Sequence, residues 1–152
     1  RQMCIRDSSE EDVIQNEADG ISIAEFPVSL VAARAAKARG MKVIAGAPNI
    51  VRGGSHSGNV SVMDLVRQNL LDALASDYVP ASMLEAVFGI VAQKTLALPE
   101  AVALVSSGPA DVAGLADRGR IEAGQRADLL QIRLYDGLPV IRSVWRGGAR
   151  VA

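Results

Sequence analysis

The sequence predicts an α/β fold, in which a parallel sheet with crossover helices is followed by a small all-β tail. Three observations carry this prediction. Apolar residues make up 49% of the 152 residues and aromatic residues only 3%, which suits small side chains packed between helices and strands. Helix and strand signals alternate from residue 9 to about residue 116. From residue 117 onward, short strands separated by glycines take over.

The composition also limits what the protein binds and where it works. A net charge of −1 provides no field that would attract nucleic acid or an anionic membrane. No apolar run is long enough to span a bilayer and no signal peptide is visible, so we expect a cytoplasmic protein. The single cysteine excludes an internal disulfide. Oligomer formation stays open.

The start of the chain differs from the rest. Residues 1–8 show neither helical nor strand periodicity, and the first residue is Arg1 rather than Met. We expect this segment to be a non-native leader, and the alternative is a disordered natural N-terminus. Neither interpretation gives it a role in chemistry.

Two helix–strand units are predicted before residue 46. A capping-box pattern at residues 8–11 predicts a short helix to about Ala18, and a strand follows over 21–24. Residues 29–39 are rich in alanine, carry Lys and Arg near their end and precede a glycine, which is typical of a helix and its C-terminal stop. The next strand is predicted over 41–45.

The pattern then breaks and resumes. Residues 46–59 contain four glycines and no amphipathic period, which predicts a long loop. A helix is predicted over 60–71 and a strand over 73–76. Prolines mark the starts of three further helices, near Pro80, Pro99 and Pro109. Three antiparallel strands are predicted over residues 127–134, 139–145 and 149–151.

Asp77 is the first candidate for chemistry. It directly follows an apolar strand and precedes a helix, which places a carboxylate at the carboxyl end of a parallel strand, where α/β barrels build their active sites. A carboxylate there can ligate a metal or accept a proton from water. The alternative is that Asp77 only caps the following helix. Glu25 ends its own strand in the same topological place and could face the same cleft.

The glycine-rich loop is the second candidate. Its glycines allow backbone amides to approach a ligand closely, and Arg52 supplies a forked cation that suits phosphate oxygens. Four further polar residues of this loop are candidate ligand contacts: Ser55, His56, Ser57 and Asn59. The alternative is a flexible spacer whose polar residues are only solvated.

The chain does not supply a complete metal site or a complete barrel. It contains one histidine, so a histidine-rich catalytic site would need ligands from elsewhere. The three predicted parallel strands are too few to close a barrel, and an open sheet would leave exposed edges. We therefore expect a piece of a larger architecture.

Four segments carry a resemblance to a known family. Residues 46–59 (GAPNIVRGGSHSGN), 76–82 (SDYVPAS) and 24–27 (AEFP) resemble a family of triphosphate diphosphatases of the carbon–phosphorus lyase pathway, within the amidohydrolase superfamily. Residues 117–129 are similar to the return strand of amidohydrolases in general.

This resemblance implies a fold and its division. Residues 9–116 would be the C-terminal part of a TIM-like (β/α)8 amidohydrolase barrel. Residues 117–152 would be the C-terminal strands of a small composite β-sandwich domain.

The resemblance also implies an activity. The family hydrolyses α-D-ribose 1-methylphosphonate 5-triphosphate, a small-molecule substrate, to the 5-phosphate and diphosphate with a divalent metal, for which we expect zinc. Asp77 would be a metal ligand and the general base, while Arg52 to Asn59 would match a family motif at the rim of the cleft, where we infer phosphate contact. The family's histidine ligands have no counterpart here, so we expect this chain to be an inactive fragment.

Two other functions stay open. The chain could belong to a different amidohydrolase, such as a deaminase or a cyclic amidase. It could also be a non-catalytic half-barrel that binds a phosphorylated ligand or a partner subunit.

Overall fold

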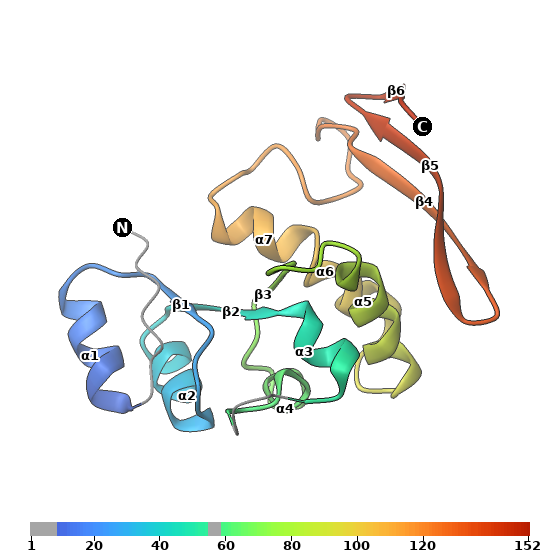
Figure 1. The fold of residues 1–152 in the computed structure, drawn as a ribbon. Helices are drawn as coiled ribbons and strands as arrows, with labels where there is room; N and C mark the ends of the chain where they lie inside the picture. Colours follow the sequence, from blue (N-terminus) through green and yellow to red (C-terminus); the bar gives the residue numbers. More distant parts are fainter. Residues whose placement is uncertain (1–8, 55–58) are drawn as a thin grey trace.

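The structure, a computed structural model, describes residues 9–54 and 59–152. Its centre is a three-stranded parallel sheet in the order β1-β2-β3 (Figure 1). The strands are β1 (Ile23–Glu25), β2 (Lys42–Gly46) and β3 (Ala73–Ala75). Because β1 pairs with β2 and β2 with β3, all in parallel, the carboxyl ends of all three strands lie at one edge. The predicted α/β fold with a parallel sheet is confirmed.

The first two helices begin at serines whose side chains cap them. In α1 (Glu10–Ala18), the Ser9 hydroxyl accepts a hydrogen bond from the Asp12 amide at 3.2 Å, and the Asp12 carboxylate accepts one from the Ser9 amide at 3.0 Å. The predicted capping box is therefore present, one residue later than expected. In α2 (Leu30–Ala38), the Ser29 hydroxyl accepts from the Ala32 amide at 3.1 Å. Both helices confirm the prediction.

The segment predicted as a loop over residues 46–59 begins instead with a helix, α3 (Ala47–Arg52). The prediction was wrong because it weighed the glycines as a group. Pro48 lies in the first turn, where its missing N–H costs nothing, and Gly53 ends the helix with a left-handed φ of 80°. Ile50 is buried on the side of α3 that packs against α5.

Two helices flank β3 and differ from their predicted bounds. Helix α4 (Val62–Arg67) is shorter than expected, because Asn69 takes a left-handed φ of 53° just beyond its end. Helix α5 (Ser82–Ala92) begins later than expected. Pro80 lies in a turn before the helix, and the N-cap is Ala81.

The remaining helices and the second sheet agree with the sequence. Pro99 and Pro109 lie near the starts of α6 (Leu98–Ala103) and α7 (Ser107–Val112). The second sheet is antiparallel, in the order β4-β5-β6. Its strands are β4 (Leu129–Tyr135), β5 (Leu138–Arg146) and β6 (Ala149–Arg150).

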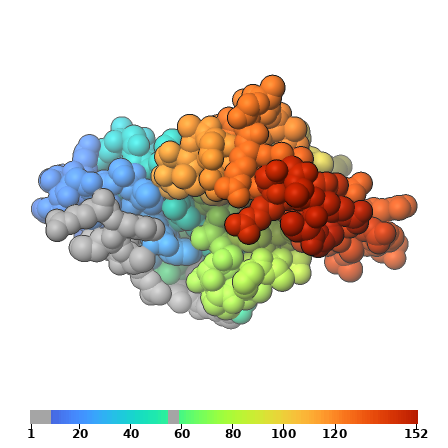
Figure 2. All heavy atoms as spheres, turned by 90° about the horizontal axis from the view of Figure 1, so that it is seen from above, coloured from blue at the N-terminus to red at the C-terminus, as the bar shows by residue number. Residues whose placement is uncertain are grey.

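The two sheets differ in how well they are covered. The largest fully buried side chains surround the parallel sheet and its helices, and they are Val13, Val43, Leu65, Val87 and Ile90. The antiparallel sheet stands at one end of the molecule, at the far side from α1 (Figure 2), and β5 contacts α5. Several of its apolar side chains are exposed: Leu130, Leu134, Leu138, Val140 and Ile141.

Candidate active site

A pocket lies at the carboxyl ends of the parallel strands. Phe26 follows β1, Gly46 ends β2 and Asp77 follows β3, and all three line it. Helix α3 contributes Asn49 and Arg52. The remaining lining residues are Pro27, Ala45, Pro48, Gly54, Asn59, Val60, Val62, Leu65 and Tyr78. The pocket therefore collects side chains from separate parts of the chain at the edge where parallel α/β folds place their ligands.

Two of these residues have an unusual backbone conformation. Phe26 has a φ of 57° and Asp77 a φ of 50°, both in the left-handed region. Aspartate tolerates this region, because its short polar side chain can interact locally, whereas a bulky aromatic residue is strained there. The Phe26 amide nevertheless continues the sheet, donating to the Ile44 carbonyl at 2.9 Å. Backbone strain of this kind concentrates at functional sites.

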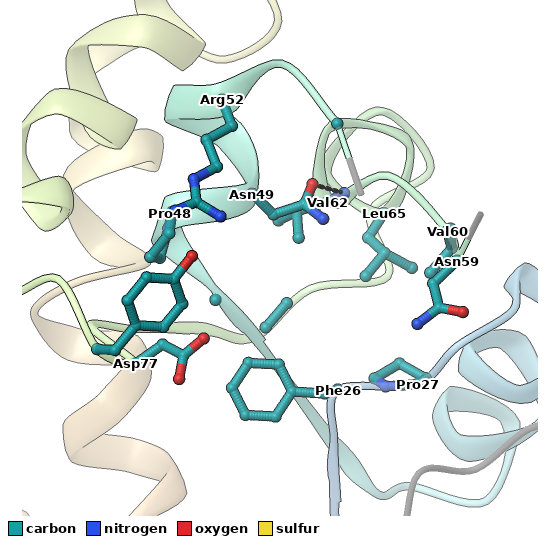
Figure 3. A pocket seen from close by; sticks show the side chains of 14 residues that line it. Phe26, Pro27, Pro48, Asn49, Arg52, Asn59, Val60, Val62, Leu65 and Asp77 are labelled. Atoms are coloured by element: carbon teal, nitrogen blue, oxygen red, sulfur yellow. Dashed lines mark hydrogen bonds between the residues drawn. The ribbon is translucent and has the colours of Figure 1, made fainter. Parts of the chain in front are cut away.

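The Asp77 carboxylate is available to a ligand. Its side chain is exposed and turned toward the pocket (Figure 3), and no hydrogen bond or ion pair joins it to another residue that the structure describes. It does not cap α5, because the N-cap of that helix is Ala81. The alternative interpretation of Asp77 as a helix cap is therefore wrong.

Gly46 makes room beside Asp77. A Cβ atom at Gly46 would lie 3.1 Å from Cε1 of Phe26 and 3.5 Å from Oδ2 of Asp77. The φ of Gly46 is −79°, which any residue adopts, so the backbone itself does not require glycine. The Phe26 ring restricts this position, because 3.1 Å is closer than ordinary contact, whereas 3.5 Å to Asp77 is an ordinary van der Waals distance.

Arg52 brings a positive charge to the same pocket. It is exposed in the last turn of α3, and its guanidinium carbon lies 5.2 Å from the centroid of the Tyr78 ring. Within residues 9–54 and 59–152 it forms no ion pair, and this includes Asp77. The pocket thus presents an unpaired cation and an unpaired carboxylate together.

Asn49 holds the two sides of the pocket together. Its side-chain oxygen accepts a hydrogen bond from the Val62 amide at 3.0 Å, which ties α3 to the first turn of α4 (Figure 3). The Val60 amide donates to the Val28 carbonyl at 3.0 Å, which ties the same segment to the residues after β1. With its oxygen engaged, the amide nitrogen of Asn49 remains as a donor.

The structure brings together only some of the residues predicted from sequence. Asp77, Arg52 and Asn59 line one pocket, with Asp77 and Asn59 on opposite sides (Figure 3). Ser55, His56 and Ser57 lie outside the described residues. Glu25 ends β1 at the same edge of the sheet, but it is half-buried and does not line the pocket.

Sequence reasoning missed Phe26, Asn49 and Tyr78. Phe26 follows a strand end much as Asp77 does, and Tyr78 adjoins Asp77, so proximity to predicted strand ends could have identified both. Asn49 carries no such signal, because its role depends on a contact with the distant Val62 amide.

The described residues do not make up a metal centre. Residues 9–54 and 59–152 contain no group of three or more histidine, cysteine, aspartate or glutamate side chains that could hold a metal ion. Asp77 can provide one carboxylate ligand, whereas a zinc site takes three or four protein ligands. In the same part of the chain, no helix is long and apolar enough to cross a membrane.

Comparison with known proteins gives relatives for nearly the whole chain. The family model described as "Amidohydrolase family" matches residues 27–152. A protein of Escherichia coli (strain K12), named alpha-D-ribose 1-methylphosphonate 5-triphosphate diphosphatase, is 47% identical over 147 residues. These residues are 95% of this chain but 39% of that relative, so the chain spans well under half the length of the relative.

Two solved structures share the fold. One is the crystal structure of an uncharacterized protein, which is 16% identical with a TM-score of 0.67, over 95% of this chain and 43% of that one. The other is an amidohydrolase from Thermotoga maritima MSB8, which is 17% identical with a TM-score of 0.54, over 86% of this chain and 43% of that one.

Proposed function

The chain belongs to the amidohydrolase family, and from this premise we propose that it forms the C-terminal part of a diphosphatase that acts on α-D-ribose 1-methylphosphonate 5-triphosphate. The 47% identity to the Escherichia coli diphosphatase supports this substrate. The observation that carries the proposal is the meeting of Asp77 and Arg52, both unpaired among the described residues, in one pocket at the carboxyl ends of parallel strands.

The proposal includes an architecture. Residues 9–116 form the C-terminal part of a (β/α)8 barrel, and residues 117–152 supply strands to a composite β-sandwich. Two features support it. Among the described residues the parallel sheet has three strands, too few to close a barrel, and the antiparallel sheet exposes large apolar side chains. Further strands would complete the barrel, and further parts of a protein would cover the apolar side chains.

The pocket suits a reaction between water and a polyanion. Arg52 and the side-chain amides of Asn49 and Asn59 provide donors for phosphate oxygens, and Asp77 provides an acceptor. Asp77 accepts a proton from the attacking water. The water oxygen forms a bond to the phosphorus of the first phosphate. The anhydride bond between the first and second phosphates breaks, and its electron pair leaves with diphosphate.

A divalent metal, for which we expect zinc, is part of the proposed enzyme. Asp77 fits one ligand position, and the described residues do not provide the others. The remaining ligands then come from outside residues 9–54 and 59–152. We also place the enzyme in the cytoplasm, because a sugar triphosphate carries too much charge to cross a bilayer unaided.

A chimaera tests the proposal. The upstream part of the Escherichia coli relative would be joined to residues 9–152 of this chain and supplied with the triphosphate. We expect the chimaera to release diphosphate, and we expect the 152-residue chain alone to release none. A folded chimaera that hydrolyses a cyclic amide or deaminates a base, and leaves the triphosphate intact, would instead favour another amidohydrolase activity.

A further inference from the structure

The Arg52 guanidinium rests on an aromatic ring rather than on a carboxylate, a contact that Arg133 also makes with Tyr135, in the second sheet and away from the pocket. Several other arginines that the structure describes use their N–H groups on carboxylates, namely Arg39, Arg67, Arg118, Arg120 and Arg126. Arg52 stacks on the Tyr78 ring instead, at 5.2 Å from the centroid. Because all guanidinium N–H groups lie in its plane, stacking occupies a face and leaves these donors unused.

Asp77 is a competing partner for the Arg52 guanidinium. Arg52 and Asp77 have opposite charges and line the same pocket, and an arginine side chain is long enough to adopt many positions. An ion pair between them would use guanidinium donors and carboxylate oxygens that a ligand needs. The structure contains no such pair, and the Tyr78 ring, next to Asp77 in the chain, takes the guanidinium.

Tyr78 itself has no evident structural role. It is 60% exposed, so its ring adds little to the core, and no hydrogen bond within residues 9–54 and 59–152 involves its hydroxyl. What the ring does provide is a flat apolar surface beside Asp77, at the place where Arg52 rests. Only the ring, not the hydroxyl, is needed for that contact.

We propose that Tyr78 is a positioning residue, whose ring holds the Arg52 guanidinium away from Asp77 and keeps its donors directed at a chain of phosphates. This inference rests on the proposed function for the class of ligand. It assigns no chemical step to Tyr78. It does make the phosphate affinity of Arg52 depend on an aromatic ring at position 78.

The test is calorimetric titration of the full chain with inorganic tripolyphosphate. Tyr78→Phe keeps the ring, and we expect its dissociation constant to stay within about twofold of the unsubstituted chain. Tyr78→Leu removes the ring, and we expect about two- to fivefold weaker binding. In an Arg52→Ala background, Tyr78→Leu should have no further effect. Adding Asp77→Asn to Tyr78→Leu should restore affinity, because the competing charge is gone.

Three results would overturn the inference. The first is equal weakening by Tyr78→Phe and Tyr78→Leu, which would assign the effect to the hydroxyl. The second is weakening by Tyr78→Leu that persists without Arg52, which would mean direct contact between the ring and the ligand. The third is no binding of tripolyphosphate by the unsubstituted chain. Since the titration needs no turnover, a chimaera that fails to release diphosphate would reject the proposed function and leave this coupling standing.

Discussion

Phe26 and Asp77 face one pocket from the ends of β1 and β3, and both have left-handed backbone, with φ values of 57° and 50°. For Asp77 this conformation costs little, whereas for Phe26 it stores strain of roughly 1–3 kcal/mol. This dependence of strain on the residue type limits which substitutions are informative at left-handed positions. A substitution at position 77 must keep a residue that tolerates left-handed backbone, or it will confuse a change of fold with a change of chemistry.

Asp77→Asn meets this requirement, because asparagine tolerates the left-handed region as well as aspartate does. The amide cannot accept a proton from water. In the chimaera we expect kcat to fall about 10²–10⁴-fold, with a much smaller change in KM. Steady-state kinetics measure both constants, and circular dichroism checks the fold. A near-normal kcat would refute the general-base role.

Arg52→Ala should act on binding. The proposed contact of the guanidinium with phosphate is charge-assisted, so we expect KM to rise about 10- to 100-fold with kcat retained. Arg52→Lys is the matched control, because it keeps the positive charge and loses the forked arrangement of donors. Its KM should lie between those of the unsubstituted and the Arg52→Ala chimaera. If kcat falls together with kcat/KM, Arg52 stabilises charge only in the transition state. Unchanged constants would make Arg52 a solvated surface residue.

Gly46→Ala should damage the pocket without unfolding the protein. The added methyl would lie 3.1 Å from Phe26 Cε1, so the ring would shift by a few tenths of an ångström, and 3.5 Å from Asp77 Oδ2, which is ordinary contact. We expect kcat/KM of the chimaera to fall by about tenfold at most, because the displaced ring changes the wall of the pocket beside Asp77.

Gly89→Ala is the control for this substitution. Gly89 lies inside α5, and the nearest atom to an added Cβ is Ile50 Cγ2 at 3.9 Å. We expect unchanged activity and stability higher by about 0.5–1 kcal/mol, measured by urea unfolding. A Gly46→Ala enzyme that matches Gly89→Ala in activity would mean that the pocket tolerates the methyl.

Acid should destabilise the segment between α7 and β4, which is flanked by Asp111 and Asp128. Hydrogen bonds from Arg120 lower the pKa of Asp111, and the Gly147 amide does the same for the pKa of Asp128. A folded-state pKa below the unfolded value of about 3.9 means that the unfolded chain binds more protons. These carboxylates therefore stabilise the fold above about pH 4, and that contribution is lost as the pH falls through the folded-state pKa.

Arg120→Gln tests this dependence. We expect its urea midpoint to lie below that of the unsubstituted chain at pH 7, and the two midpoints to converge below about pH 3. Both groups of the pair are exposed on the surface, so the difference at pH 7 should be small. A difference of the same size at both pH values would mean that Arg120 acts through packing rather than through the charge of Asp111.

Local signals in the sequence were sufficient to place a helix where they agreed with one another. Ser29 precedes an alanine-rich run and Gly40 follows it, and α2 occupies the interval between them. The same kind of signal was present at α3, where Pro48 opens the helix and Gly53 closes it. In the prediction of a loop over residues 46–59, the number of glycines outweighed this signal, although only the position of each glycine matters.

The site was less predictable than the fold. Asp77 could be placed at a strand end from the sequence, because the end of an apolar run identifies the edge of the sheet. The ring contact of Arg52 and the hydrogen bond from Asn49 to the Val62 amide could not, since each joins residues that only the folded chain brings together. Their partners are distant in sequence, and no periodicity links them.

The anchoring of the segment between α3 and α4 has a consequence for evolution. Before this segment, Gly53 and Gly54 bond to Ile50 and Asn49, and after it Val60 and Val62 bond to Val28 and Asn49. These bonds use backbone atoms and the side chain of Asn49. Substitutions at Arg52 or Asn59 leave all of them in place. The two pocket residues can therefore be exchanged in evolution, and ligand preference can change, while the sheet that places Asp77 keeps its position.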